Sequence, residues 1–153
     1  MSEYRVTIDW QGSATPEDFL KGRYLREHRW TFDGGAVVEA SSAPSVVRPP
    51  WSNPSHVDPE EALVAAISSC HMLTFLYLAS KAGFVVSDYR DDAVGIMTKT
   101  ADGVEWVSRV TLAPRITYAG NQPSGEQLAE LHHKAHHQCF IANSVKTEIV
   151  VGA

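Results

Sequence analysis

The stretch between Asp58 and Gly83 constrains the fold more than any other part of the sequence. It reads DPEEALVAAISSCHMLTFLYLASKAG, and no residue from Ala62 to Ala79 carries a full charge. Apolar residues recur at helical spacing along one side, and the opposite side is apolar as well. A helix that is apolar on nearly all sides is usually buried on nearly all sides. The sequence therefore predicts a long central helix enclosed by the rest of the chain.

Both ends of this helix carry recognisable signals. Asp58 can act as the N-cap, Pro59 suits the first helical position, and Glu61 stands where a capping box places an acid. Lys81 falls in the last turn, and Gly83 just beyond it provides the usual stop.

A membrane-spanning helix is the alternative interpretation, because the uncharged run is about long enough to cross a bilayer. Against it, polar residues interrupt the middle of the run, at Ser68, Ser69, His71 and Thr74, and acidic residues precede it. We therefore expect no membrane partner.

The composition is that of one soluble globular domain covering residues 1–153, with 44% hydrophobic and 20% charged residues. A net charge of -5 and a pI near 5.7 argue against nucleic acid as a partner. The first ten residues contain no apolar signal segment, and two cysteines without such a signal predict reduced thiols in the cytoplasm.

Alternating segments around the helix predict an α+β fold with antiparallel sheet covering buried helices. Residues 11–21 are polar and irregular and are read as a loop. Residues 41–57 hold four prolines and are read as a functional loop over one end of the central helix. A second helix is expected to begin near Ser124. The expected strands are 4–10, 24–32, 36–40, 89–99, 104–112, 115–118 and 145–151.

The two cysteines, Cys70 and Cys139, each fall on the apolar stripe of a predicted helix. One interpretation is that both are small buried hydrophobic residues, as free cysteines often are. The other is that they react. A thiol in apolar surroundings has a raised pKa, so a reactive cysteine here needs a cation nearby.

Two segments resemble the OsmC/Ohr family of thiol-dependent peroxidases. The first, PEEALVAAISSCHMLTFLYLASKAG, places Glu60 ten residues before Cys70, as in the family's signature helix. The second, KAHHQCFIANSVKTEIVV, is similar to the family's second cysteine helix and terminal strand. The resemblance covers Asp33 to Val151. It implies the OsmC-like fold, with antiparallel sheets wrapped around a long buried central helix in an intertwined homodimer.

The resemblance also implies the chemistry. Cys70 would be the peroxidatic thiolate that becomes a sulfenic acid, and Cys139 the resolving thiol that condenses with it to a disulfide. The expected substrates are organic hydroperoxides, with hydrogen peroxide as a further candidate. No cofactor would be bound. An external dithiol, of which a lipoyl group is one candidate, or a reductase protein would restore the thiols.

An arginine oriented by Glu60 completes the family's site. The Ohr branch takes it from a Gly-Gly-Arg hairpin, whereas the hairpin here reads Asp33-Gly34-Gly35. The OsmC branch takes it from the loop before the signature helix, where this sequence has Arg48. We therefore expect Arg48 to activate Cys70, with Arg26 as the second candidate.

Helix geometry constrains how Glu60 can serve Cys70. Ten residues of straight helix separate the two by about 15 Å and rotate them by about 280°. Either the helix breaks between them, or Glu60 serves the thiol of the other subunit. We predict the second, an obligate dimer whose sites combine residues from both chains.

The histidines suggest an alternative function. His71 departs from the family pattern, and it has either a chemical role or a buried hydrogen-bonding one. His132 and His136 have the i,i+4 spacing of a helical metal site, with Cys139 three residues further on. We expect a solvated helix face and no metal. The alternatives are an OsmC-fold protein that uses Cys70, His71 and the cluster of residues 132–137 to bind a ligand or metal, and a stress-storage protein without turnover.

Overall fold

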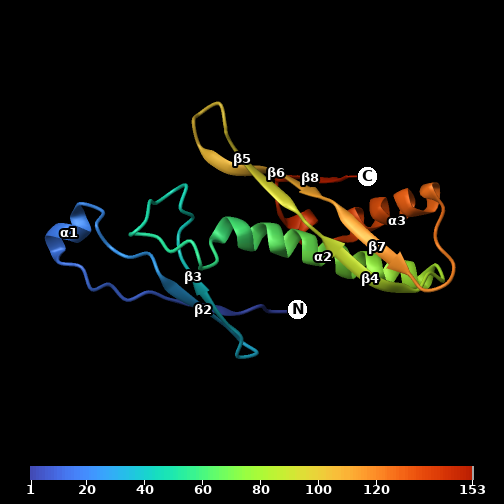
Figure 1. The fold of residues 1–153 in the computed structure, drawn as a ribbon, viewed down its shortest axis with the longest axis horizontal. Helices are drawn as coiled ribbons and strands as arrows, with labels where there is room; N and C mark the ends of the chain where they lie inside the picture. The colour runs from blue at the N-terminus through green and yellow to red at the C-terminus, as the bar shows by residue number, and fades with distance from the viewer. Residues whose placement is uncertain (153) are drawn as a thin grey trace. The chain divides into compact units, whose positions relative to one another are not determined.

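A computed structural model describes residues 1–152 of the chain. Its elements are ordered β1, α1, β2, β3, α2, β4, β5, β6, β7, α3, the short 3-10 helix η1 and β8 (Figure 1). The chain divides into two compact units, residues 1–62 and residues from 63 onward. Each unit is described by itself.

The first unit is built on an antiparallel sheet with the strand order β1-β2-β3. The register pairs Trp30 of the central strand with Ile8 on one side and Val38 on the other. The expected hairpin turn is confirmed, with Gly35 at φ 88°. The strands are β1 (Val6–Asp9), β2 (His28–Phe32) and β3 (Val37–Ala40).

A short helix, α1 (Pro16–Leu20), lies between β1 and β2. The expectation of an irregular loop over residues 11–21 is therefore wrong. Thr15 is the N-cap, and its hydroxyl accepts a hydrogen bond from the backbone N–H of Asp18. Pro16 occupies the first helical turn, where a backbone N–H has no partner within the helix, so the N–H that proline lacks costs no hydrogen bond.

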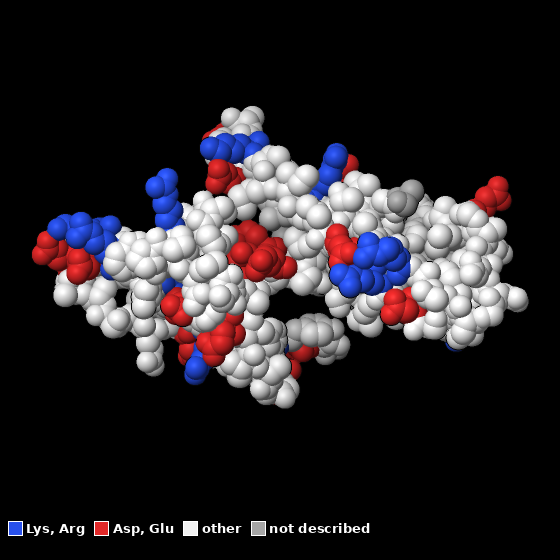
Figure 2. All heavy atoms as spheres, viewed as in Figure 1, with Lys and Arg blue, Asp and Glu red and all other residues white. Residues whose placement is uncertain are grey.

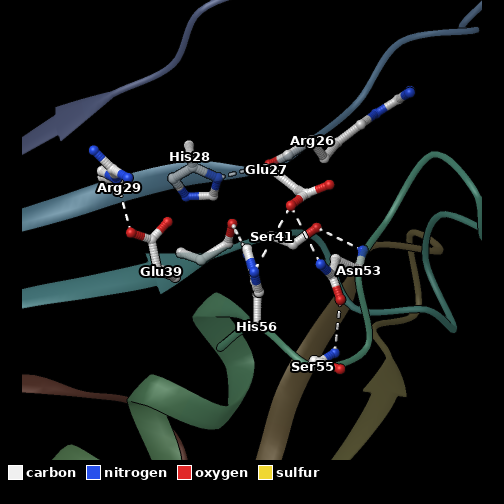
Figure 3. A network of polar contacts seen from close by, with 10 residues as sticks. Arg26, Glu27, His28, Arg29, Glu39, Ser41, Asn53, Ser55 and His56 are labelled. Atoms are coloured by element: carbon white, nitrogen blue, oxygen red, sulfur yellow. Dashed lines mark hydrogen bonds and ion pairs between the residues drawn. The ribbon is translucent and has the colours of Figure 1, made fainter.

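The proline-rich segment, residues 41–57, contains no helix or strand, as expected. Polar contacts fix it to the sheet (Figure 3). Ser41 is fully buried and accepts from the backbone N–H of Asn53 at 3.0 Å. Glu27 of the segment before β2 accepts from the Asn53 amide at 3.2 Å and lies 3.7 Å from His56. The segment is therefore an ordered loop.

The first unit encloses no large apolar side chain among its described residues. Its buried apolar residues are Ala40 and Ala43 alone. Many of its large apolar side chains are instead exposed on the strands, directly after β1 and on α1, where they are Val6, Ile8, Trp10, Phe19, Leu20, Phe32 and Val37. A unit of this size with so little buried apolar surface is not expected to be stable in water without further cover.

Helix α2 runs without a break from Pro59 to Lys81. Its predicted start is confirmed, because Asp58 Oδ1 accepts from the Glu61 N–H at 2.8 Å and Glu61 Oε2 accepts from the Asp58 N–H at 3.3 Å. Its predicted stop is confirmed as well. Gly83 adopts φ 85°, and the N–H of Phe84 donates to the Ala79 carbonyl.

Two small sheets and two helical segments accompany α2 in the second unit. One sheet pairs β4 with β7 in antiparallel fashion, and the other has the order β5-β6-β8. These elements are β4 (Val86–Asp91), β5 (Val94–Lys99), β6 (Glu105–Leu112), β7 (Pro114–Tyr118), α3 (Gly125–Gln138), η1 (Ala142–Ser144) and β8 (Glu148–Val151).

Two expectations about these strands are wrong. The single strand over residues 89–99 is two strands, since β4 ends at Asp91 and β5 begins at Val94 in a different sheet. The sheets are also not all antiparallel, because β8 pairs with β6 in parallel. The connection from β6 to β8 includes β7 and α3, which gives the chain enough length for a parallel crossover.

The core of the second unit has two clusters. In one, Phe75 and Ala79 of α2 pack with Leu131 and Ala135 of α3. In the other, Ile67 of α2 packs on residues of β6. Gly95 of β5 permits this approach, because a Cβ there would lie 2.5 Å from the side chain of Val64.

Helix α2 is buried on one face only, so the prediction of burial on nearly all sides is wrong for a single chain. Its buried residues are Ile67, His71, Phe75 and Ala79. On the opposite side Leu73 is 61% exposed and Tyr77 58% exposed. The helix is long and apolar enough to span a membrane by length and composition, a property that core helices of globular proteins share.

Charged side chains form small mixed groups on the surface. On the face drawn in Figure 2, the described Lys and Arg residues lie in separate groups, most of them beside Asp or Glu. Arg90 and Arg115 form ion pairs with Asp92, and these guanidiniums hold the pKa of that carboxyl below its usual value. No continuous basic surface is present on that face among these residues.

Candidate active site

The structure brings Cys70 and Cys139 together, although 69 residues separate them in the sequence. Cys70 is half-buried in the middle of α2, and Cys139 is 1% exposed at the C-cap of α3. Burial, and then the neighbouring Cys70 thiol, raise the pKa of the Cys139 thiol to about 11. Both are free thiols. The two sulfur atoms therefore lie within reach of one another.

Cys70 lines an open cavity of about 930 Å³ in the second unit. Apolar side chains dominate its wall, among them Leu73 and Tyr77 of α2 and Phe140 and Ile141 beyond α3. None of the residues that line this cavity carries a charge. The cavity thus suits an apolar molecule, and the cation that a thiolate requires is not among its lining residues.

Glu60 and Arg26 line a second cavity, of about 470 Å³, which lies within the first unit. The Arg26 guanidinium stacks 3.5 Å above the ring of Tyr24 and donates to the carbonyls of Gly22 and Tyr24. Burial raises the pKa of Glu60. No ion pair joins Arg26 to Glu60 within the described residues, but both face the same cavity.

Arg48, the arginine favoured by sequence, lies on the exposed surface of the proline-rich loop. It is not among the residues that line the cavity with Glu60. The structure therefore groups Glu60 with Arg26, which sequence reasoning ranked second.

An aromatic cluster beside Arg26 was missed by sequence reasoning. Phe19 of α1 stacks on Tyr24 with ring centroids 4.5 Å apart, and Trp10 lies 5.9 Å from Tyr24. All three line the cavity with Arg26. The sequence signal for this cluster is Thr15-Pro16, because an N-cap residue followed by a proline predicts the start of a helix. Helix α1 in turn places Phe19 near the sheet.

The continuity of α2 decides between the two ways in which Glu60 could serve Cys70. The break that would let them meet on one helix does not occur, because α2 is helical throughout residues 59–81. Ten residues of unbroken helix keep the two side chains about 15 Å apart along the axis. A break in α2 is therefore not the way in which Glu60 serves Cys70, and the contribution of Glu60 from another subunit stays a prediction.

Comparison with known proteins places the chain in a family. A profile of OsmC-like proteins matches residues 52–153. The chain belongs to the OsmC-like protein family. An OsmC-like protein of unknown function from Vibrio cholerae O1 biovar eltor is 46% identical over 99% of each chain, with a TM-score of 0.94. No curated protein matches the sequence at a significant level.

Organic hydroperoxide resistance proteins share the fold of this OsmC-like protein. One from Elizabethkingia anophelis is 18% identical, with a TM-score of 0.69 over 99% of this chain and 93% of that one. One from Legionella pneumophila is 14% identical, with a TM-score of 0.68 over 99% and 96%. The resemblance and the OsmC-like α+β fold predicted from sequence are confirmed.

His71 of this OsmC-like protein is not among the residues that line the cavity with Cys70. It is 1% exposed, and its Nε2 lies 3.0 Å from Nδ1 of His132 on α3. The two rings stack with centroids 5.3 Å apart, and His132 also stacks on Phe75 at 4.5 Å. Burial, and then the proximity of His132 and His136, lower the pKa of His71 to about 4. Of the two roles considered for His71, the structure displays the buried hydrogen-bonding one.

The histidine cluster of α3 does not gather a metal site. Among residues 1–152, no three His, Cys, Asp or Glu side chains lie close enough together to hold a metal ion. His132 is engaged with His71, while His133, His136 and His137 are exposed. The i,i+4 spacing therefore lacks the third ligand that a stable site needs.

The buried His71 makes stability depend on pH. Its pKa is about 4 in the folded protein and near 6.5 in an unfolded chain, so the unfolded chain binds the proton more readily. The free energy of unfolding is expected to decrease as the pH falls from 6.5 toward 4. Burial lowers the pKa of His132 in the same direction, and Asp91 opposes both shifts. Urea unfolding of H71F at pH 7.5 and 4.5 should show a smaller acid loss than the wild type. Equal losses would contradict this role.

Proposed function

We propose that this protein is a thiol-dependent peroxidase that reduces organic hydroperoxides through Cys70 and Cys139. The observation that carries the proposal is the proximity of these two thiols, of which Cys70 lines an apolar cavity. Structural likeness to hydroperoxide resistance proteins supports a redox role for the fold. Free, adjacent thiols are what a two-cysteine cycle requires before it starts.

The cycle has three balanced steps. The Cys70 thiolate attacks the outer oxygen of a hydroperoxide, the O–O bond breaks, and the alkoxide takes a proton to leave as an alcohol. The Cys70 sulfenic acid then condenses with the Cys139 thiol, which forms the disulfide and releases water. An external dithiol reduces the disulfide and is itself oxidised to a disulfide.

The surroundings of the two sulfurs assign them different roles. Cys70 is half-buried and lines the cavity, so it is the thiol that a substrate can reach. Cys139 is buried, and its raised pKa keeps it protonated until a sulfenic acid forms beside it. The apolar wall favours hydroperoxides with hydrocarbon chains over hydrogen peroxide, which remains a further candidate substrate.

The exposure of Cys70 also defines how the disulfide is reduced. The sulfur of Cys139 is covered, so an incoming dithiol attacks the Cys70 sulfur through the open side of the cavity. A lipoyl group on a flexible arm, or a reductase protein with an exposed dithiol, meets this requirement. A reducing compartment such as the cytoplasm supplies both.

We propose that a second copy of the chain supplies the missing cation. Arg26, held by two carbonyls and lining a cavity with Glu60, is better placed for this than the exposed Arg48. Because α2 keeps Glu60 away from Cys70 of the same chain, Arg26 and Glu60 of one copy serve Cys70 of the other. A guanidinium beside the sulfur stabilises both the thiolate and the departing alkoxide.

The apolar surface of the chain supports a homodimer. The first unit buries no large apolar side chain, and Leu73, Tyr77 and Phe140 in the second unit are 61%, 58% and 82% exposed. Exposed apolar surface of this extent is typical of a chain that is buried against another copy.

Cysteine variants test the cycle. Reaction of the reduced protein with one equivalent of cumene hydroperoxide should form a Cys70–Cys139 disulfide, seen by mass spectrometry as a loss of two hydrogens. C139S should stop at a Cys70 sulfenic acid or its over-oxidised products, because no resolving thiol is present. C70S should consume no peroxide. Two unchanged thiols in the wild type would refute the peroxidase function.

Mixed dimers test the source of the cation. R26A and C70S should each be inactive alone, because every site lacks either the arginine or the thiol. When they are unfolded together and refolded at equal amounts, about a quarter of wild-type activity should return, since half the dimers regain one of two sites.

R48A is the matched control, because it removes a guanidinium from the exposed loop, and it should keep near wild-type activity. Loss of activity in R48A with full activity in R26A would return the assignment to Arg48. Absence of recovery in the mixture, with mixed dimers verified by mass, would exclude a site shared between chains.

A further inference from the structure

One buried polar contact stands in the otherwise apolar interface between α2 and α3. Phe75, Ala79, Leu131 and Ala135 make up the buried apolar part. The polar contact is the hydrogen bond of 3.0 Å between His71 and His132. His71 precedes the apolar contacts on α2 and follows Cys70 directly, so this contact is the part of the interface nearest the thiols in sequence.

The contacts show that the two helices run antiparallel. Phe75 stacks on His132, whereas Cys70, which is earlier on α2, lies beside Cys139, which is later than His132 along the chain. Residue numbers thus fall along α2 as they rise along α3. Any sliding of α3 along α2 changes all of these pairings at once, and it moves Cys139 relative to Cys70 by the same amount.

Apolar contacts alone fix such a register weakly. Alanine, leucine and phenylalanine surfaces gain similar energy in several registers, because burial of apolar area has no direction. A buried hydrogen bond is directional, and a slip that breaks it leaves two buried ring nitrogens without partners, which is unfavourable. His71 is 1% exposed, and its Nδ1 has no partner in the described residues. Hydrogen bonds to water therefore do not replace the bond to His132 when it is broken.

Disulfide formation is sensitive to this register. A helix rises about 1.5 Å per residue, and a disulfide tolerates a Cα–Cα range of only about 4.4–6.8 Å. A slip of one or two residues therefore shifts the cysteine Cα atoms by an amount comparable to the whole tolerated range.

We propose that His71 and His132 are a positioning pair whose hydrogen bond sets the register of α3 on α2 and thereby aligns Cys139 with Cys70. The proposal rests on the proposed two-cysteine function, in which this alignment governs the condensation step. Neither histidine contacts the reacting atoms. The pair acts through the helix to which each thiol is attached.

The other polar groups near the pair are already engaged elsewhere. Asp91 of β4 accepts a hydrogen bond from Ser68 and another, at 2.7 Å, from the backbone N–H of Ala113. His136 lies one turn beyond His132 and is exposed. Neither side chain replaces the His71–His132 bond, so loss of that bond removes the only side-chain hydrogen bond between α2 and α3 within the described residues.

The test is a double substitution that keeps ring volume and removes the bond, H71F/H132F. Replacing both partners by apolar groups is nearly neutral for stability, so the melting temperature should stay close to that of the wild type. The readout is equilibrium with glutathione, in which the dithiol and oxidised glutathione exchange to the protein disulfide and two reduced glutathione molecules. The equilibrium constant should fall about three- to tenfold, the net effect of one hydrogen bond.

H133F is the matched control, because His133 is an exposed histidine on the same helix, and its equilibrium constant should equal that of the wild type. A double Phe variant within twofold of the wild type would overturn the proposal. Should that variant fold poorly, H71Q/H132Q decides. Its side-chain amides can bond again, so it should keep the wild-type constant, and a tenfold loss would contradict the positioning role.

This readout is independent of peroxide turnover. A wild type that forms the disulfide with glutathione but consumes no cumene hydroperoxide would refute the peroxidase function and leave the positioning pair intact. A wild type that reduces cumene hydroperoxide, together with an H71F/H132F variant whose glutathione equilibrium constant is unchanged, would support the peroxidase function and refute the positioning pair.

Discussion

The packing of α3 against α2 is the constraint on which the rest of this structure depends. It joins Phe75 and Ala79 to Leu131 and Ala135, adds one histidine pair, and ends where Cys139 reaches Cys70. Neither cysteine is unusual by itself. The chemistry that we propose for them follows from the interface, because a sulfenic acid on α2 could be resolved only by a thiol that α3 holds beside it.

Under the proposed function, the same interface explains why a single chain would be an incomplete enzyme. It uses the buried face of α2 for α3 and the sheets, which leaves the face with Leu73 and Tyr77 exposed and Cys70 without a cation. The first unit has the opposite deficiency. It carries Arg26 and Glu60 on an aromatic cavity but no buried core. A second copy would correct both, since it would cover apolar surface and supply the guanidinium.

Local signals in the sequence predicted the elements whose ends are set locally. Asp58 and Gly83 bound α2 as expected, and Ser124 caps α3 through a capping box with Gln127. The family resemblance, rather than spacing, suggested the meeting of the two thiols. Contacts between segments that are distant in the sequence could not be predicted from it. Three features depend on which surfaces pack together: the parallel pairing of β8, the His71–His132 bond and the one-sided burial of α2. The periodicity of apolar residues in the sequence does not predict which surfaces those are. Helix α1 was missed although its Thr-Pro start was present.

The most direct measurement of the central claim is a titration of the reduced protein with phenylarsine oxide. This trivalent arsenical condenses with two neighbouring thiols and releases water, and it needs neither peroxide nor a partner. The account predicts one arsenic bridged between Cys70 and Cys139 in each chain, stable to a monothiol and released by a dithiol. Two thiols that are alkylated independently in the folded protein, with no bridged arsenic, would contradict it.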